Sequence, residues 1–460
     1  MKIKLLAVLS LVFAGICGAE ENRPNIVFIM ADDLGPGWVD LTGSSEKINT
    51  PNLERLARSG MVFTKAYAAA PVCSPTRAAC ITGMSPARVG YTTHAPGMGL
   101  EKYLWKNGGR GKGGPVDAES REFIPFEFPS YARELKRLGY ATGFFGKWHL
   151  AGEGSVSRPD GVVNAAWHPE HYGFDVNVGG CAYGQPKSWF DPYRNATIEG
   201  RAEGEYLTDR LGDEAAEFIR ANQEGPFHVT LWLYSVHTPI RAPADLVEKN
   251  GGDAYLAMLE SMDTAVGKVI AALEETGSLE NTLLVFYSDN GGWKPTEGLA
   301  EEKGSLLEGG VRVPMVVSWP KVIEPASESS VPVTSMDFFP TFVNAAGGDA
   351  GRFKELDGLD LMPLFEGGSD LGREALYWHF PHHRKGIDYM MGSSILEGDW
   401  KLYLGYAETG DALFNLRKDP GETNNVLDEN PEHAYRLKKK LDAWLLQSGA
   451  RMPRTDADFE

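Results

Sequence analysis

The stretch Asn25-Ile26-Val27-Phe28-Ile29-Met30, which runs through Ala31 into Asp32 and Asp33, decides the fold class of this chain. An apolar, largely β-branched run ends abruptly in two carboxylates that a strand has no structural need for. The same pattern recurs in three other stretches: 282–287 before Asp289 and Asn290, 141–145 before Lys147 and His149, and 227–233 before His237. Continuous apolar runs of this length are typical of strands buried on both faces.

Helical patterns lie around and between these four stretches, over residues 53–60, 129–139, 208–221 and 254–277. Strands that alternate with helices predict an α/β fold, with a large and mainly parallel central sheet sandwiched by helices. Ligands of such sheets bind beyond the carboxyl ends of the strands. We therefore expect the four polar endings to converge on one cleft.

The endings of the first two stretches are rich in oxygen ligands. Asp32, Asp33, Asp289 and Asn290 offer hard oxygens without a nearby thiolate or histidine pair, which suits Ca²⁺ or Mg²⁺ better than Zn²⁺. Calcium is favoured because its coordination is larger and more forgiving. Taken singly, each of these residues could equally serve a turn or a helix cap.

The segment Cys73-Ser74-Pro75-Thr76-Arg77 is the most specific motif of the chain. Pro75 favours the first turn of a helix, which would put Cys73 at the helix N-terminus, where partial positive charge suits a nucleophile. At average composition, four cysteines would produce Cys-x-Pro-x-Arg by chance in about one chain in a hundred. Chance is therefore a weak explanation.

With this motif the sequence resembles the formylglycine-dependent sulfatases of the alkaline phosphatase superfamily, in which Cys-x-Pro-x-Arg directs oxidation of the cysteine to Cα-formylglycine. The resemblance runs nearly end to end, because further family motifs occur in order: Arg23-Pro24-Asn25, Ala31-Asp32-Asp33-Leu34-Gly35, Thr50-Pro51-Asn52-Leu53, Gly146-Lys147-Trp148-His149-Leu150, His237-Thr238-Pro239, Ser288-Asp289-Asn290-Gly291 and Arg312-Val313-Pro314. The tail, with Asp399-Trp400-Lys401-Leu402 and Leu413-Phe414-Asn415-Leu416, resembles the family's smaller C-terminal α+β subdomain, which carries an antiparallel sheet and a final helix.

The resemblance also implies roles for the site residues. Cys73 would be the modified nucleophile, Arg77 would hold it, and calcium would be bound by Asp32, Asp33, modified Cys73, Asp289 and Asn290. The residues expected around the sulfate are Lys147, His149, His237 and Lys303, with His237 protonating the departing alcohol and His149 acting as a base. Lys303 lies in Glu301-Glu302-Lys303-Gly304, which could also be a solvated loop.

The function implied is hydrolysis of sulfate monoesters, with a sulfated carbohydrate as the expected substrate and a formylglycine-generating maturation enzyme as a required partner. One alternative is a phosphonate monoester hydrolase or phosphodiesterase of the same superfamily. The other is a calcium-binding, lectin-like relative without catalysis. The net charge of −18 argues against nucleic acid as a partner.

The expected organisation is a signal peptide over 1–19, a catalytic domain over 20–370 and a C-terminal subdomain over 371–460. Lys2 and Lys4 precede an apolar run over 5–16, which predicts export to the periplasm or the extracellular space. Lipidation at Cys17 is a minor alternative, and no later stretch suits a membrane span. Removal of the signal would leave Cys73, Cys80 and Cys181, so at least one thiol stays unpaired.

Two weaker features were considered. The glycines of residues 109–114 match a nucleotide-binding pattern, but neither a strand nor a helix is predicted around them, which favours a loop near the mouth of the site. His379, His382 and His383 lack the spacing of a zinc site. For these histidines a substrate-facing loop is the preferred interpretation.

Overall fold

The computed structural model describes residues 23–94, 117–152, 165–383, 387–406 and 409–454. The expected signal over 1–19, Cys17 and the glycine loop over 109–114 lie outside the described residues.

The central sheet has eight strands within the described residues, in the order β5-β4-β6-β1-β7-β8-β2-β9. Their bounds are β1 (Asn25–Ala31), β2 (Met61–Phe63), β4 (Ala141–Gly146), β5 (Val176–Val178), β6 (Phe227–Trp232), β7 (Thr282–Ser288), β8 (Val316–Ser318) and β9 (Ser327–Ser329). Strand β1 pairs in parallel with β6 and β7, whereas β8 runs antiparallel to β7 and β2. The sheet is thus mixed but mainly parallel, as predicted.

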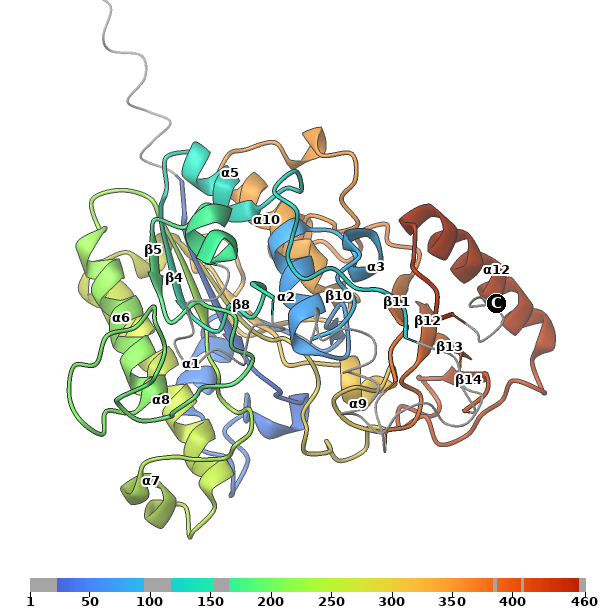
Figure 1. Cartoon of the computed structure of the whole chain (residues 1–460), viewed down its shortest axis with the longest axis horizontal. Helices are drawn as coiled ribbons and strands as arrows, with labels where there is room; N and C mark the ends of the chain where they lie inside the picture. The colour runs from blue at the N-terminus through green and yellow to red at the C-terminus, as the bar shows by residue number, and fades with distance from the viewer. Residues whose placement is uncertain (1–22, 95–116, 153–164, 384–386, 407–408, 455–460) are drawn as a thin grey trace, which may run out of the picture.

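Helices cover both faces of this sheet (Figure 1). Alternate residues of β1 explain the two layers, since the side chains of a strand point to opposite faces. Phe28 packs in a core cluster with residues of α2 (Cys73–Thr82), α5 (Tyr131–Arg137) and α10 (Phe338–Ala345). Ile29 packs in a second cluster with α1 (Pro51–Ser59), α6 (Leu207–Ala221) and α8 (Ala254–Glu275).

Shorter elements complete this part of the chain. The remaining helices and strands are β3 (Ala66–Tyr67), α3 (Pro86–Val89), α7 (Ala244–Lys249), α9 (Glu308–Val311), β10 (Val333–Thr334) and α11 (Met362–Phe365), and single 3₁₀ turns span Pro36–Trp38, Ala165–Trp167, Pro169–Tyr172, Leu279–Asn281, Ser335–Asp337 and Ala350–Arg352.

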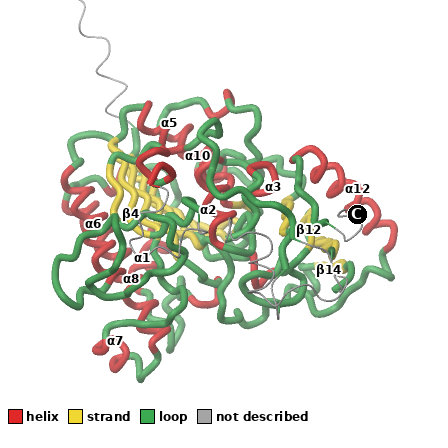
Figure 2. The backbone as a smooth tube through the Cα atoms, in the orientation of Figure 1, coloured by secondary structure: helices red, strands yellow, loops and turns green. Residues whose placement is uncertain are grey.

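The C-terminal region forms a separate antiparallel sheet, with strands β11 (Leu376–Phe380), β12 (Gly392–Glu397), β13 (Trp400–Gly405) and β14 (Ala412–Asn415) in sequence order. Its long helix α12 (Pro431–Ser448) covers one face through a cluster that includes Ile395, Leu402 and Leu437. The opposite face packs against the larger part of the molecule, where Trp378 and Tyr403 join Tyr67 and Val311 in one cluster. Figure 2 shows these strands set apart from the central sheet.

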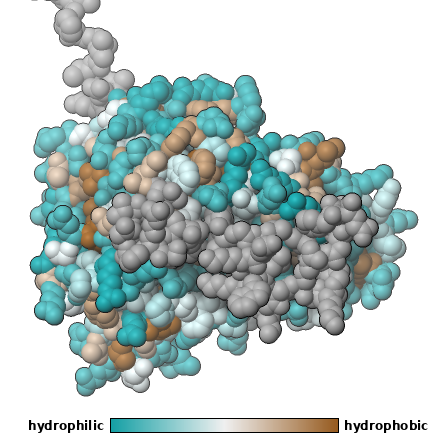
Figure 3. Space-filling model, viewed as in Figure 1, coloured by the Kyte–Doolittle hydropathy of each residue, from teal (hydrophilic) through white to brown (hydrophobic). Residues whose placement is uncertain are grey.

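The outer surface is polar over most of the face drawn in Figure 3. Among the described residues, no helix combines the length and apolar character that crossing a membrane requires.

Candidate active site

The polar endings of β1 and β7 meet at one edge of the central sheet. These strands are parallel neighbours, with Ala31 opposite Ser288, so the residues that follow them lie side by side. The backbone N–H of Asp33 donates to Oδ1 of Asp289 at 3.2 Å, and Asn290 Nδ2 donates to Oδ1 of Asp33 at 2.8 Å. All four predicted oxygen ligands, Asp32, Asp33, Asp289 and Asn290, are buried here.

Helix α2 begins at Cys73 and presents it to these acids. Its Sγ lies 3.5 Å from Oδ1 of Asp32 and 3.9 Å from Oδ1 of Asp33. One ligand atom each from Asp32, Asp33, Cys73 and Asp289 can be chosen so that all four lie within 4.8 Å of one another. The placement of Cys73 at a helix N-terminus, predicted from Pro75, agrees with the start of α2.

Each of the three carboxylates is paired with a buried cation. Lys147 Nζ lies 2.5 Å from Oδ2 of Asp32, and Arg77 Nη2 lies 2.7 Å from Oδ2 of Asp289. Lys303 Nζ lies 2.5 Å from Oδ1 of Asp33 and donates to Cys73 Sγ at 3.2 Å. Lys303 is only 7% exposed, so the segment around it is not a solvated loop.

Arg77 also ties α2 to the ends of two strands. Its Nη1 donates to the carbonyl oxygen of Lys147 at 2.7 Å, directly after β4. Its guanidinium lies over the ring of Trp232, the last residue of β6, at 5.2 Å from the ring centre. A planar guanidinium satisfies these contacts at once, which a lysine could not do. The sequence predicts Trp232 only as part of a buried strand, and its contact with Arg77 is visible only in the folded chain.

Burial and the crowded charges shift the pKa values of the central residues. Burial raises the pKa of Asp289 to about 6, the charge of Asp32 adds to this rise, and Arg77 opposes it. Burial alone would raise the pKa of Asp33, but Lys303 and His237 hold it well below its usual range. Burial raises the pKa of the Cys73 thiol to about 12 against the opposing charges of Lys147 and Lys303. An unmodified Cys73 is therefore a thiol at neutral pH and a poor nucleophile.

His237 stands at the margin of this cluster, with 15% of its side chain exposed. Its Nδ1 lies 2.5 Å from the carbonyl oxygen of Thr238, an acceptor, so Nδ1 carries the proton. Nε2 then points toward Asp33, 3.7 Å from Oδ2. Burial lowers the pKa of His237 to about 3, against the raising effect of Asp33. The imidazole is consequently neutral in this structure.

His149 lies beside the start of α2. Its carbonyl oxygen accepts from Ser74 Oγ at 2.8 Å, and its backbone N–H donates to the carbonyl oxygen of Cys181 at 3.0 Å. The ring packs against Gly184, where an added Cβ would lie 2.4 Å from Cε1. Cys181 and Gly184 thus position His149 through tertiary contacts that no sequence pattern predicted.

The side-chain oxygen of Asn290 indicates whether the clustered residues could bind a metal ion. Its Oδ1 is buried and has no hydrogen-bond partner among the described residues, although Nδ2 donates to both Asp33 and the carbonyl oxygen of Gly291. A buried acceptor without a partner is unfavourable, and an oxygen-seeking cation would satisfy it. With three carboxylates around it, the donor set fits Ca²⁺ as predicted from the sequence.

Two of the three C-terminal histidines are buried and bond to partners outside the charged cluster. His379 is a buried residue of β11, and its ring contacts Ser393 Oγ at 2.7 Å and the carbonyl oxygen of Arg451 at 3.0 Å. His382 is buried against Thr92 Oγ1 at 2.8 Å. The preferred interpretation as a substrate-facing loop is therefore wrong for His379 and His382: the pairing of β11 places His379 in a sheet, and the contact with Thr92 accompanies the burial of the His382 ring.

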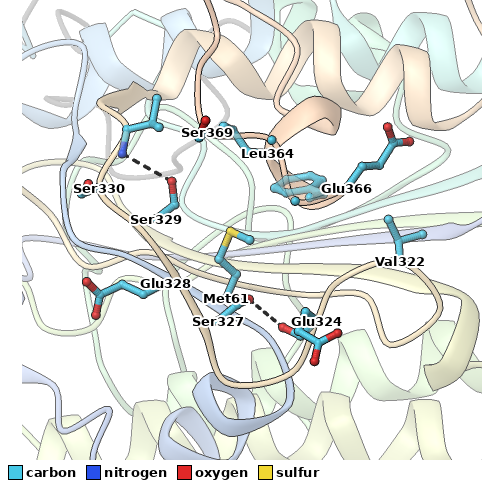
Figure 4. A pocket seen from close by; sticks show the side chains of 14 residues that line it. Met61, Val322, Glu324, Ser327, Glu328, Ser329, Ser330, Leu364, Glu366 and Ser369 are labelled. Atoms are coloured by element: carbon cyan, nitrogen blue, oxygen red, sulfur yellow. Dashed lines mark hydrogen bonds between the residues drawn. The ribbon is translucent and has the colours of Figure 1, made fainter.

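A separate hollow of 570 Å³ lies between the edge strand β9 and helix α11. Figure 4 shows it lined by Met61, Ser327, Glu328, Leu364 and Glu366, with none of the predicted site residues among its lining. Its lining shares no residue with the charged cluster.

Comparisons with known proteins agree with this geometry. The Sulfatase family model matches residues 24–348, and the model described as N-sulphoglucosamine sulphohydrolase, C-terminal, matches residues 301–449. A sulfatase of Formosa agariphila is 30% identical, covering 94% of this chain and 90% of its own. The N-acetylgalactosamine-6-sulfatase of Mus musculus is 31% identical, covering 91% and 85%. The crystal structure of Ps i-CgsB in complex with k-i-k-neocarrahexaose is 29% identical and covers 92% and 93%, with a TM-score of 0.76.

Fold and charged cluster thus define a hydrolase of the alkaline phosphatase superfamily. Within it, the chain belongs to the sulfatase family and is a sulfatase, an enzyme that hydrolyses sulfate esters.

Proposed function

We propose that this enzyme removes sulfate from sulfated carbohydrates and that it works with Cys73 oxidised to Cα-formylglycine and with bound Ca²⁺. The observation that carries the proposal is the position of Cys73, at the start of α2 among three carboxylate–cation pairs. The high pKa of its thiol supports the modification, since an unmodified Cys73 would be a weak nucleophile. The hydrate of the aldehyde would supply a hydroxyl for attack on sulfur and a second hydroxyl that permits release of sulfate.

Calcium would be held by Asp32, Asp33, Asp289, Asn290 and the modified side chain of residue 73. When bound, it would supply positive charge next to the non-bridging oxygens of the sulfate. The three carboxylates are already matched by Lys147, Lys303 and Arg77. A divalent cation would therefore leave the cluster with net positive charge, which suits an anionic ester.

Lys147 and Lys303 are expected to stabilise the charge that develops on the sulfate oxygens. Arg77 orients residue 73 from one turn along α2, because its guanidinium is fixed by Asp289 and the carbonyl oxygen of Lys147. These contacts keep the donors in place before substrate arrives, so little reorganisation is needed during the reaction.

His237 would give a proton to the departing alcohol from Nε2, since Nδ1–H is engaged by the carbonyl oxygen of Thr238. The low pKa of its ring applies without substrate; an anionic ester beside it would raise this pKa and favour the protonated form. His149, beside residue 73, would act as the base that helps to release sulfate.

A carbohydrate substrate is supported by the relatives. The N-acetylgalactosamine-6-sulfatase and the complex with k-i-k-neocarrahexaose are named for sugars, and both cover more than nine-tenths of this chain. We further propose that the N-terminal segment directs export and that a maturation enzyme oxidises Cys73. Comparing cytoplasmic and exported fractions of the expressed full chain would test the first point, with retention in the cytoplasm as the contrary result.

The decisive experiment pairs mass spectrometry with activity. The peptide containing Cys73 should be lighter by about 18 Da than its thiol form, and the protein should release sulfate from nitrophenyl sulfate and from a panel of sulfated oligosaccharides. Cys73→Ala should fold and be inactive, whereas Cys80→Ala, a buried cysteine on the same helix, should keep activity. Faster hydrolysis of an aryl phosphodiester or phosphonate ester than of any sulfate, or full turnover by Cys73→Ala, would refute the proposal.

A further inference from the structure

The segment that carries Lys303 has no regular secondary structure of its own before α9 begins. It is instead held by backbone bonds to three distant parts of the chain. Its N–H donors pair with these carbonyl oxygens: Lys303 with Gly292 at 2.9 Å, Gly304 with Pro71 at 2.9 Å, and Leu306 with Tyr389 at 2.8 Å. The last partner belongs to the C-terminal region, just before β12. Residues outside the catalytic cluster therefore help to set the position of Lys303.

Directly after this segment lies a buried ionic network. Glu308, the first residue of α9, has no exposed surface, and its Oε1 accepts from Lys401 Nζ at 2.9 Å. Lys401 is a fully buried residue of β13 that also lies 3.1 Å from Oε1 of Glu422. The backbone N–H of Glu308 donates to Oε2 of Glu422 at 2.6 Å. One ammonium thus holds two carboxylates together across the junction of α9 and the C-terminal sheet, which adjoin in Figure 1.

The other oxygen of Glu308, Oε2, accepts from the Tyr67 hydroxyl at 3.0 Å and from Arg312 Nη1 at 3.4 Å. Burying two carboxylates is unfavourable unless a cation is fixed between them. Arg312 forms an ion pair with Glu308, whereas Lys401 pairs with both Glu308 and Glu422. Without Lys401 the two carboxylates would face each other with no cation between them, and we expect the start of α9 to move. Because Lys303 is only five residues before Glu308, such a movement would be transmitted to its ammonium.

We propose that Lys401 is a positioning residue for the sulfatase reaction: by holding Glu308 and Glu422 together it fixes the segment 303–308, and with it the Lys303 ammonium against Cys73 and Asp33. The inference rests on the proposed function, in which Lys303 stabilises the sulfate. It makes the C-terminal sheet a contributor to turnover, although none of its residues touches the charged cluster in the contacts described above.

A double-mutant cycle between Lys401 and Lys303 tests this role. All variants are compared as folded, calcium-loaded protein with the same content of formylglycine, with nitrophenyl sulfate as substrate. Lys303→Ala should lose about 10²–10³-fold in kcat. Lys401→Met should lose about 10–10²-fold in kcat with little change in KM, because a misplaced donor weakens the transition state. Lys401→Arg, which can still bridge two carboxylates, should recover most of the rate.

The combined variant decides between positioning and general support. If Lys401 acts through Lys303, then Lys303→Ala/Lys401→Met should be no slower than Lys303→Ala alone. Arg210→Met is the matched control, because Arg210 is also a buried cation between two carboxylates. It lies in α6, 3.0 Å from Glu205, which precedes the helix, and 2.7 Å from Glu214 of the same helix. This substitution should lower the melting temperature while leaving kcat unchanged in the folded fraction.

If Lys401→Met yields no folded protein, Glu422→Gln takes its place in the cycle. It keeps an acceptor for the Glu308 N–H but removes one charge of the network, and a smaller kcat loss that vanishes with Lys303→Ala is expected. An unchanged kcat in folded Lys401→Met, or a full additional loss on top of Lys303→Ala, would overturn the inference. Failure of the proposed function would give a different result: wild-type protein would release no sulfate, or Lys303→Ala would turn over normally. In the second case Lys303 would have no catalytic role for Lys401 to support.

Discussion

The side-chain amide of Asn290 is the most direct probe of the proposed metal site, because its Oδ1 has no partner in the described part of the chain while its Nδ2 has two. Asn290→Ala removes one oxygen ligand, and we expect calcium affinity to fall at least about tenfold. Asn290→Asp keeps an oxygen there and should retain calcium. The measurement is calcium titration of chelator-treated protein, followed by the rise in melting temperature.

Metal analysis provides the contrary outcome for this prediction. Active protein that contains stoichiometric zinc and no calcium, or an Asn290→Ala variant with unchanged calcium affinity, would remove Asn290 from the ligand set.

Substrates with different leaving groups can show whether His237 acts as a proton donor or only binds the sulfate. If Nε2 donates the proton, His237→Ala should reduce kcat/KM for an accepted sugar sulfate by about 10²–10⁴-fold, since a sugar alcohol leaves poorly. Nitrophenyl sulfate should be affected much less, because nitrophenolate leaves without a proton. His171→Ala, which alters an exposed histidine, serves as the control. Equal losses for both esters would make His237 an anion-binding residue instead of an acid.

At the scale of elements, the end of β4 places Lys147 and depends on one glycine. Gly146 has φ of 108°, and a Cβ there would lie 2.0 Å from the carbonyl oxygen of Trp232. Gly146→Ala should therefore lower the free energy of unfolding by about 3 kcal/mol or more and reduce activity by displacing Lys147.

Gly139 offers a matched comparison, because it also has positive φ, of 87°, but no atom within 4 Å of an added Cβ. Gly139→Ala should lower the unfolding free energy by only about 1–2 kcal/mol and leave activity unchanged. Urea unfolding and nitrophenyl sulfate turnover measure both variants. Similar losses for the two substitutions would show that backbone strain, and not the close approach at Gly146, controls this position.

The strands and helices that carry the site were predictable because their patterns are strong. The apolar runs over 25–30 and 282–287 became β1 and β7, and the periodic stretches over 208–221 and 254–277 became α6 and α8 with bounds shifted by one or two residues. The motifs also predicted Cys73 and the acidic residues that the structure places beside it. Strand order was beyond reach, because pairing between β1 and β7 joins residues more than 250 positions apart.

Contacts set only by packing could not be predicted. The family resemblance predicts Lys303 at the site, but its local sequence does not, since it stands among glutamates in an irregular segment and only the folded chain brings it to Cys73. The interpretation preferred from the sequence places His379 in a substrate-facing loop, yet the pairing of β11 with β12 makes it a strand residue. Trp232 under Arg77 and Gly184 against His149 are likewise products of tertiary contact.

At the scale of the whole molecule, the C-terminal sheet shares an apolar interface with β3 and α9 of the larger part, so the chain should unfold as one unit. Residues of both parts, including Tyr67 and Trp378, belong to one buried cluster, and the Lys401–Glu308 pair crosses the same junction. We expect calorimetry to show a single transition. Two separate transitions would mean that the predicted boundary near residue 370 divides independently stable units.

A variant in the C-terminal helix makes this prediction sharper. Leu437 is fully buried between α12 and its sheet, and Leu437→Ala should cost about 2–5 kcal/mol and lower the whole transition. Leu446→Ala, on the same helix but 84% exposed, should leave it in place. If Leu437→Ala lowered the melting temperature of only part of the calorimetric transition, the chain would not be a single cooperative unit.

The burial of α2 has a consequence for the order of events during biosynthesis. All ten residues from Cys73 to Thr82 are buried, so a second protein cannot bind this motif once the chain has folded. The proposed oxidation should then take place on the newly made, still unfolded polypeptide. Folding afterwards buries residue 73, whether or not it has been oxidised. A maturation enzyme should accordingly convert Cys73 in a peptide or in denatured chain, and leave it as a thiol in native protein. A cell that lacked this early step would accumulate well-folded enzyme that no later treatment could activate.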